Sequence, residues 1–297
     1  MPVRNKAGDF SREVLDLFDA YVHGAIDRRG FIERCAAQAG SAVAATAILA
    51  ALSPDFAAAQ VIGADDRRIR TARVDIASPA GNGRINAYVA RPAAAGGKPL
   101  PAVLVIHENR GLNPHIEDIA RRIAVDGYMA VAPDALTSLG GYPGDEDKAR
   151  ALFQTLDRDR MNADFIASAR HALSMPGANG HLGAVGFCFG GGIANMLATQ
   201  LPELKAAAPF YGAPAPIADV PKITAELMLH FAANDSRVNA GWPAYEAALK
   251  QAGKRYQAFF YDGTEHGFNN DTTPRYDKEA ADLAWSRTMG LFRRTLA

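Results

Sequence analysis

Cysteine is scarce in this chain, and neither sign of charge is in excess. Only Cys35 and Cys188 occur among the 297 residues, and we expect Cys35 to lie in a segment that is removed or set apart from the fold. Cys188 would then be unpaired, so no disulfide is expected. Lysine and arginine together number 32, as do aspartate and glutamate. Because the net charge is zero and no basic block follows the N-terminal segment, the sequence predicts no nucleic-acid partner.

Patterns that bind metal are missing as well. The chain contains no His-Glu-x-x-His and no cluster of cysteine and histidine with ligand spacing, so we expect no metal site. It shows no internal repeat, and nothing in it specifies a stable protein partner. With 48% hydrophobic and 22% charged residues, the composition is that of an ordinary globular protein, long enough for one large domain or two small ones.

The first 59 residues have the pattern of an export leader. Arg28 and Arg29 are followed by Phe31-Ile32 and by the Ala-rich stretch Ala36 to Leu52, which is too short and too polar for a confident membrane span. Ala57-Ala58-Ala59 supplies small residues for cleavage. Residues 1–59 therefore resemble a twin-arginine leader, which predicts use of the twin-arginine export machinery, cleavage after Ala59 and a periplasmic or exported protein. The alternative is a cytoplasmic protein with an Ala-rich N-terminal helix.

Residues 60–297 read as one α/β domain. Val74 to Ala77 and Ile85 to Ala90 alternate on either side of Gly81-Asn82-Gly83, which predicts an antiparallel hairpin. From the apolar run Ala102 to Ile106 onward, strand-like and helical stretches alternate to the end of the chain. We therefore expect a mostly parallel sheet that begins with an antiparallel hairpin and carries helices on both faces.

The stretch from Gly186 to Gly192 has the pattern of a nucleophile elbow. A strand-like run precedes it, a helical run from Ile193 to Leu201 follows it, and Cys188 stands between small neighbours. The turn would expose the thiol above a sheet, where the N–H groups and the dipole of the following helix favour a thiolate. The alternative is a small buried cysteine in a glycine-rich packing contact.

An acid and a histidine follow two later strands. Asp235 comes after the apolar run Leu227 to Ala232, and His266 after Tyr256 to Tyr261. In an open α/β sheet, functional groups gather at the C-terminal ends of the strands. The chain order of Cys188, Asp235 and His266 is that of an α/β-hydrolase triad, in which a nucleophile attacks a carbonyl, histidine moves the proton and aspartate orients the histidine. Separately, an aspartate in a turn and a lone histidine are usually structural.

Four motifs in this order resemble the dienelactone hydrolase family over about residues 70 to 295. They are Gly-Phe-Cys-Phe-Gly-Gly-Gly at 186–192, His-Glu-Asn-Arg-Gly-Leu-Asn at 107–113, Asn-Asp at 234–235 and His-Gly-Phe at 266–268. The resemblance implies an α/β-hydrolase fold and a cofactor-free hydrolase of lactones or esters that works through an acyl-thioester on Cys188. The alternative is a catalytically silent exported protein that binds a small molecule on the same fold, although such a protein has no need of a complete triad.

The resemblance also implies roles for the loop that follows the first parallel strand. Glu108 is expected to pair with the resting Cys188 and to release it when substrate binds; the alternative is a solvated pair with Arg110. One oxyanion donor is expected to be the backbone N–H of Phe189, the residue after the nucleophile. The other is expected to be the backbone of Asn109.

The substrate is less defined than the reaction. Dienelactone-specific members hold the substrate carboxylate with two arginines, one of them four residues after the catalytic histidine, where this chain has Asn270. The second arginine would fall near Lys148 and Arg150. Phe210 and Tyr211, at the end of their strand, are expected to line the pocket. Because Asn270 cannot form a guanidinium fork, a neutral ester or lactone, or an acid held differently, is as consistent with the sequence as dienelactone.

Overall fold

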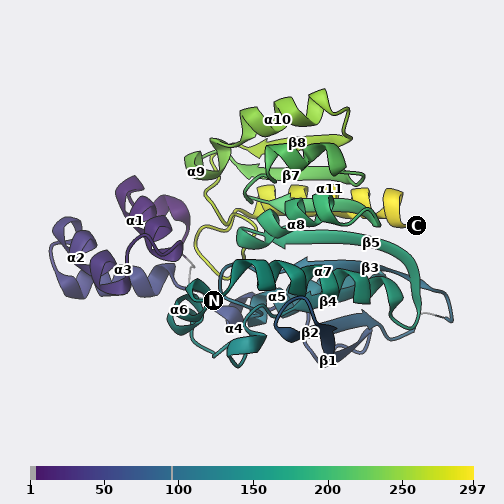
Figure 1. The fold of residues 1–297 in the computed structure, drawn as a ribbon. Helices are drawn as coiled ribbons and strands as arrows, with labels where there is room; N and C mark the ends of the chain where they lie inside the picture. Colours follow the sequence, from purple (N-terminus) through teal and green to yellow (C-terminus); the bar gives the residue numbers. More distant parts are fainter. Residues whose placement is uncertain (1–4, 95) are drawn as a thin grey trace.

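An eight-stranded sheet forms the centre of the fold in the computed structural model, which describes residues 5–94 and 96–297 (Figure 1). The strand order is β1-β2-β4-β3-β5-β6-β7-β8. The pairs β1–β2 and β2–β4 are antiparallel, and all other neighbours are parallel. The predicted fold class is confirmed. The strands are β1 (Ile69–Ser78), β2 (Gly83–Pro92), β3 (Leu100–Ile106), β4 (Met129–Pro133), β5 (Ala178–Phe187), β6 (Leu204–Phe210), β7 (Glu226–Ala232) and β8 (Tyr256–Tyr261).

Helices cover both faces of this sheet. One apolar cluster joins the strands to α7, α8 and α10, and a second joins the opposite face to α5 and α11. Because helices pack on both sides, the central strands are buried almost completely and read as continuous apolar runs. The helices of this domain are α5 (Pro114–Val125), α6 (Glu146–Gln154), α7 (Arg158–Ser174), α8 (Phe189–Gln200), α9 (Ser236–Asn239), α10 (Trp242–Gln251) and α11 (Lys278–Leu296).

The N-terminal segment forms helices with an apolar cluster of their own. They are α1 (Arg12–Val22), α2 (Arg28–Ala39), α3 (Ala42–Leu52) and the short α4 (Phe56–Ala59). Phe18, Tyr21 and Phe31 pack their rings together at the centre of the cluster, and Cys35 lies fully buried there as a free thiol. Figure 1 shows α1, α2 and α3 in purple beside the sheet, whereas α4 contacts α5 of the domain. The apolar side chains of α1, α2 and α3 therefore bury one another.

This segment also contacts the domain around the C-terminal edge of the sheet. Arg12 forms an ion pair with Glu265 at 2.9 Å, and Arg28 forms one with Asp147 at 3.2 Å. The stretch from Ala42 to Ala59 is apolar and long enough to cross a membrane by length and composition, a property that N-terminal signal sequences share. Cleavage after Ala59 and export are not decided by these contacts and stay predictions.

Candidate active site

The turn at Cys188 is a strained elbow between β5 and α8. Cys188 has φ 54° and ψ −113°, a backbone conformation that side chains with a Cβ rarely adopt. Two glycines make the turn possible: a Cβ on Gly186 would lie 1.9 Å from the carbonyl oxygen of Gly190, and a Cβ on Gly190 would lie 2.3 Å from that of Ile106. Helix α8 begins at Phe189, earlier than the sequence pattern predicts, because the glycines continue the helix. The predicted elbow is present.

The acid and the histidine meet beside this elbow. Asp235 Oδ2 accepts a hydrogen bond from His266 Nδ1 at 2.5 Å, and both side chains are buried. The backbone N–H of Val238 donates to Asp235 Oδ1, so this carboxylate also caps α9. His266 Nε2 is buried without a hydrogen-bond partner among the described residues, and a ring nitrogen of His266 lies within 4.8 Å of the Cys188 sulfur. The three residues named from chain order are thus brought together.

The charges around Cys188 favour its ionised form. Burial opposes the thiolate, but the positive charges of His266 and His23 outweigh burial and lower the pKa of Cys188 to about 5. Burial likewise opposes an imidazolium at His266, yet the Cys188 thiolate and Asp235 raise the pKa of His266 above its ordinary value. Burial would raise the pKa of Asp235, but its hydrogen bond and charge interaction with His266 lower it. These interactions favour a thiolate at Cys188 and an imidazolium at His266.

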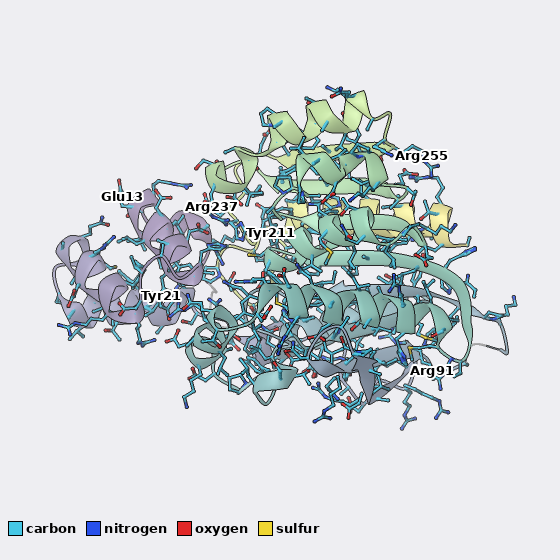
Figure 2. All side chains as sticks on the ribbon, viewed as in Figure 1. Glu13, Tyr21, Arg91, Tyr211, Arg237 and Arg255 are labelled. Carbon is cyan, nitrogen blue, oxygen red and sulfur yellow. The ribbon has the colours of Figure 1, made fainter. Side chains whose placement is uncertain are left out.

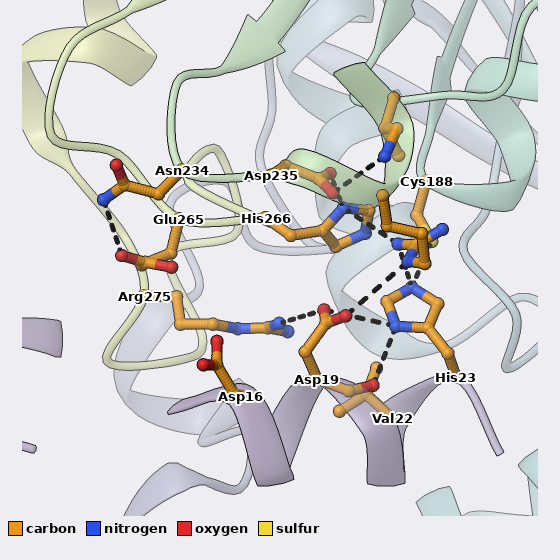
Figure 3. A network of polar contacts seen from close by, with 12 residues as sticks. Asp16, Asp19, Val22, His23, Cys188, Asn234, Asp235, Glu265, His266 and Arg275 are labelled. Atoms are coloured by element: carbon orange, nitrogen blue, oxygen red, sulfur yellow. Dashed lines mark hydrogen bonds and ion pairs between the residues drawn. The ribbon is translucent and has the colours of Figure 1, made fainter. Parts of the chain in front are cut away.

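A second histidine, which the sequence did not indicate, also contacts the nucleophile. His23 follows α1, and its Nε2 lies 3.4 Å from Cys188 Sγ (Figure 3). His23 Nδ1 lies 3.2 Å from Asp19 Oδ1, one turn back on the same helix. Arg237 and Arg275 face the Asp19 carboxylate at 3.6 and 3.7 Å. His23 was not predicted as a site residue because it lies in the predicted leader and does not follow a strand.

Glu108 and Asn109 lie beside the nucleophile but contact other groups. The Glu108 carboxylate accepts a hydrogen bond from Asn270 Nδ2 at 3.1 Å, and Arg110 pairs with Glu146 rather than with Glu108. The Asn109 amide donates to the carbonyl of Val22 at 2.9 Å. The release of Cys188 by Glu108 and the oxyanion role of the Asn109 backbone stay predictions. Phe189 is the first residue of α8, so its N–H has no partner within the helix.

Two of the four predicted substrate contacts, Tyr211 and Asn270, line the cavities at Cys188. Phe210 does not: its side chain is fully buried in the core, with its ring centroid 4.3 Å from that of His230. Successive residues of a strand point to opposite faces, and the chain leaves the strand at Tyr211, which has φ 38°. Lys148 lies on the exposed side of α6, outside the cavity linings.

Two cavities open on Cys188, of about 230 and 460 Å³. The smaller is lined by groups of both charges, including Glu108, Arg110 and Arg275, together with Phe18 and Tyr21 from α1. The larger is mostly apolar, with three arginines and no carboxylate in its lining, and His23 is part of its wall. Figure 2 shows Tyr21, Tyr211 and Arg237 at this junction of the N-terminal helices and the domain. The N-terminal segment thus supplies part of both walls.

Among the described residues, one group could hold a metal ion. Ligand atoms of His23, Cys188 and His266 lie within 4.8 Å of one another, and cysteine and histidine are ligands that zinc prefers. Arg237 Nη2 lies 2.9 Å from His23 Nε2, so a metal ion at that nitrogen would have to displace the guanidinium.

The domain is similar in sequence to one known protein family. A family model described as the dienelactone hydrolase family matches residues 85–296. The chain belongs to this family. It is 34% identical over 246 residues to a candidate carboxymethylenebutenolidase of Synechocystis sp., covering 77% of this chain and 98% of that protein. It is also 49% identical over 113 residues to a candidate hydrolase fragment of Escherichia coli, YghX, covering 38% of this chain and 96% of the fragment.

Solved structures of dienelactone hydrolases share the fold. A candidate dienelactone hydrolase from Klebsiella pneumoniae is 29% identical, with a TM-score of 0.67 and coverage of 76% of this chain and 99% of that chain. P91, a dienelactone hydrolase-like promiscuous phosphotriesterase from metagenomic libraries, is 25% identical, with a TM-score of 0.66 and coverage of 77% and 100%. A separate family model, described as YqhI-like, matches residues 1–40, which contain α1 and α2.

Proposed function

We propose that this dienelactone hydrolase family member is a cysteine-dependent hydrolase of small ester or lactone substrates. The observation that supports the proposal most is the buried Asp235–His266 pair beside Cys188, which itself occupies a strained elbow. In the first step the thiolate attacks the carbonyl carbon and the alcohol leaves, and in the second step water hydrolyses the thioester. Asp235 keeps a proton on His266 Nδ1, so Nε2 is the nitrogen that exchanges protons.

The developing oxyanion needs donors that are already in place. The N–H of Phe189 and the backbone N–H of Asn109 are our candidates, since the first begins α8 directly after the nucleophile and the second lies in the loop after β3. Glu108 is proposed to leave Asn270, to pair with the Cys188 thiol before substrate binds and to release it when substrate binds, so that the thiolate favoured by the two histidines is the form that reacts. No cofactor is needed for these steps.

The larger cavity suggests the substrate. Arg150, Arg158 and Arg237 line it among apolar side chains, and no carboxylate lies in its lining. An ester or lactone with an apolar body and one negative charge would find compensating charge there. The expected preference is tested with matched pairs of esters that differ only in a free carboxylate, by comparing kcat/KM at low and high salt. Equal values for both members of each pair would assign the cavity to neutral substrates.

The protonation of Cys188 gives a direct test of the proposed nucleophile. Because its pKa is lowered to about 5, iodoacetamide is expected to alkylate Cys188 at a constant rate above about pH 6 and more slowly below pH 5, whereas an ordinary thiol gains reactivity only near about pH 8.5. Intact-mass analysis follows the alkylation while hydrolysis of p-nitrophenyl esters and lactones is measured. The experiment includes substrate as an activator and Glu108→Gln, since a thiol held by Glu108 would react slowly.

A catalytically silent binding protein is the competing function. It would bind ester or lactone without turnover, and alkylation of Cys188 would then leave no activity to lose. Turnover that disappears in proportion to alkylation decides for the hydrolase.

Export through the twin-arginine machinery remains our proposal from the sequence of residues 1–59, with cytoplasmic retention as the alternative. Sequencing the N-terminus of the protein purified from the periplasmic and cytoplasmic fractions tests it. A periplasmic protein that starts at Gln60 would support cleavage, whereas a start at residue 1 or 2 would contradict it and would leave His23 in the mature protein.

A further inference from the structure

The N-terminal segment brings a second imidazole to the reacting sulfur. His23 Nε2 lies 3.4 Å from Cys188 Sγ, and the rings of His23 and His266 lie 4.7 Å apart between centroids, with their planes at 80°. The two imidazoles therefore reach one sulfur along different directions. His266 comes from the loop after β8 and His23 from the end of α1, so each is held by a different part of the chain.

Each imidazole has its own carboxylate. Asp235 receives the Nδ1–H of His266 at 2.5 Å, and Asp19 faces the Nδ1 of His23 through a carboxylate oxygen at 3.2 Å and its backbone carbonyl at 2.8 Å. In both cases the contact keeps the proton on Nδ1 and leaves Nε2 to face the nucleophile.

We propose that Asp19 and His23 form a second histidine–carboxylate pair of the reaction, in which the His23 imidazolium holds the Cys188 thiolate and then donates its Nε2 proton to the leaving alkoxide. The proposal rests on the proposed hydrolase function of the same site. It assigns a catalytic residue to the N-terminal segment, so it requires that this segment stay in the active protein and is incompatible with the cleavage after Ala59 that the sequence predicts.

The first step balances without any added reagent. The Cys188 sulfur forms a bond to the carbonyl carbon, the carbon–oxygen bond of the ester breaks with its electron pair on oxygen, and the His23 proton converts that oxygen into an alcohol. Once the sulfur is acylated, its charge no longer holds the proton on His266, and this proton passes to solvent. Neutral His266 then takes a proton from water, whose oxygen attacks the thioester carbon. The carbon–sulfur bond breaks to restore the thiolate, the acid product releases its proton to solvent, and His23 regains a proton from solvent.

The surrounding charges explain why His23 holds its proton first and gives it up later. Burial opposes the imidazolium, but the Cys188 thiolate and Asp19 outweigh burial and raise the pKa of His23 to about 10. Once the carbon–sulfur bond forms, the sulfur is no longer charged, so the pKa of His23 falls. Arg237 Nη2, a donor only, lies 2.9 Å from Nε2 and favours the imidazole that has lost this proton. The charged groups that face the pair are Asp19 from α1, Cys188 from the elbow, His266 from the loop after β8, Arg237 from α9 and Arg275 from the loop before α11.

His23→Gln in the full chain tests the proposal through two measurements. Loss of general-acid assistance is expected to lower kcat for alkyl esters by about 10² to 10⁴-fold, and to lower it far less for p-nitrophenyl esters, because p-nitrophenolate leaves without a proton. The pH midpoint of Cys188 alkylation is expected to rise, because one of its two positive neighbours is gone. Asp19→Asn, which keeps the imidazole but weakens its charge, is expected to shift both measurements in the same direction by less.

His171→Gln on the last turn of α7 is the matched control and is expected to change neither measurement. Circular dichroism shows that each variant is folded. Equal losses for alkyl and p-nitrophenyl esters together with an unchanged alkylation midpoint would overturn the proposal, as would an active enzyme isolated with its N-terminus at Gln60. If Cys188→Ala retained activity, the hydrolase function itself would be wrong, whereas the alkylation midpoint of His23→Gln would still decide whether His23 pairs with the thiolate.

Discussion

Replacing Cys188 by alanine is expected to abolish hydrolysis, with a loss of about 10⁶-fold in kcat, the size found when the nucleophile of a comparable serine triad is removed. The reason is that no other group lies where it could form the acyl intermediate: among the described residues, His266 and His23 both approach the Cys188 sulfur itself. Alanine keeps the positive φ of the elbow and leaves the two histidines without the negative charge between them. The loss is measured from the hydrolysis of a p-nitrophenyl ester, at an enzyme concentration high enough for the residual rate to exceed the uncatalysed rate.

Cys35→Ala is the control for this experiment. Cys35 is the other cysteine, fully buried in the apolar cluster of the N-terminal helices and remote from the elbow in the chain. Its replacement removes one sulfur atom from that cluster and leaves Cys188, Asp235 and His266 unchanged, so activity is expected to stay within about twofold of that of the parent protein. Activity that survives in Cys188→Ala and falls in Cys35→Ala would reverse the assignment of the nucleophile.

Replacing Gly190 by alanine is expected to destabilise the whole domain by about 3 kcal/mol or more, at the upper end of what overpacking costs. The added Cβ would lie 2.3 Å from the carbonyl oxygen of Ile106 and 2.6 Å from that of His107. Both atoms are backbone atoms of β3 or the residue after it, in the centre of the sheet, and no side-chain rotation can relieve the contact. Urea unfolding followed by circular dichroism measures the change in the free energy of unfolding, and activity is expected to fall with it because α8 can no longer approach β3.

Gly290→Ala is the matched control for this substitution. Gly290 lies within α11, and a Cβ there meets no atom within 4 Å. Alanine at this position removes the conformational freedom that glycine has in the unfolded chain, so the domain is expected to gain about 0.5 to 1 kcal/mol. If Gly190→Ala and Gly290→Ala unfolded at the same urea concentration, the close packing of the elbow against β3 would not determine the stability of the domain.

The chain order of the apolar runs and the glycine pattern predicted most of the fold and the proximity of Cys188, Asp235 and His266. Alternating apolar and helical runs predicted the sheet with its antiparallel start, and the ends of β5, β7 and β8 predicted Cys188, Asp235 and His266 as neighbours. These predictions work because parallel strands bring their C-terminal ends to one edge, whatever the sequence distance between them. The substrate contacts were less predictable. Phe210 and Tyr211 are adjacent in sequence, but the first packs into the core and the second faces the cavity.

What the sequence by itself determined is therefore the local chemistry: an elbow that only glycines permit, and an acid and a histidine at strand ends. Only the tertiary structure decided which side chains surround Cys188. The docking of α1 on the sheet edge is set by long-range contacts such as Arg12 with Glu265 and Asn109 with the carbonyl of Val22, none of which has a local sequence pattern. These contacts place His23 beside the Cys188 sulfur. An argument from strand ends could not have predicted this second imidazole, because His23 does not follow a strand.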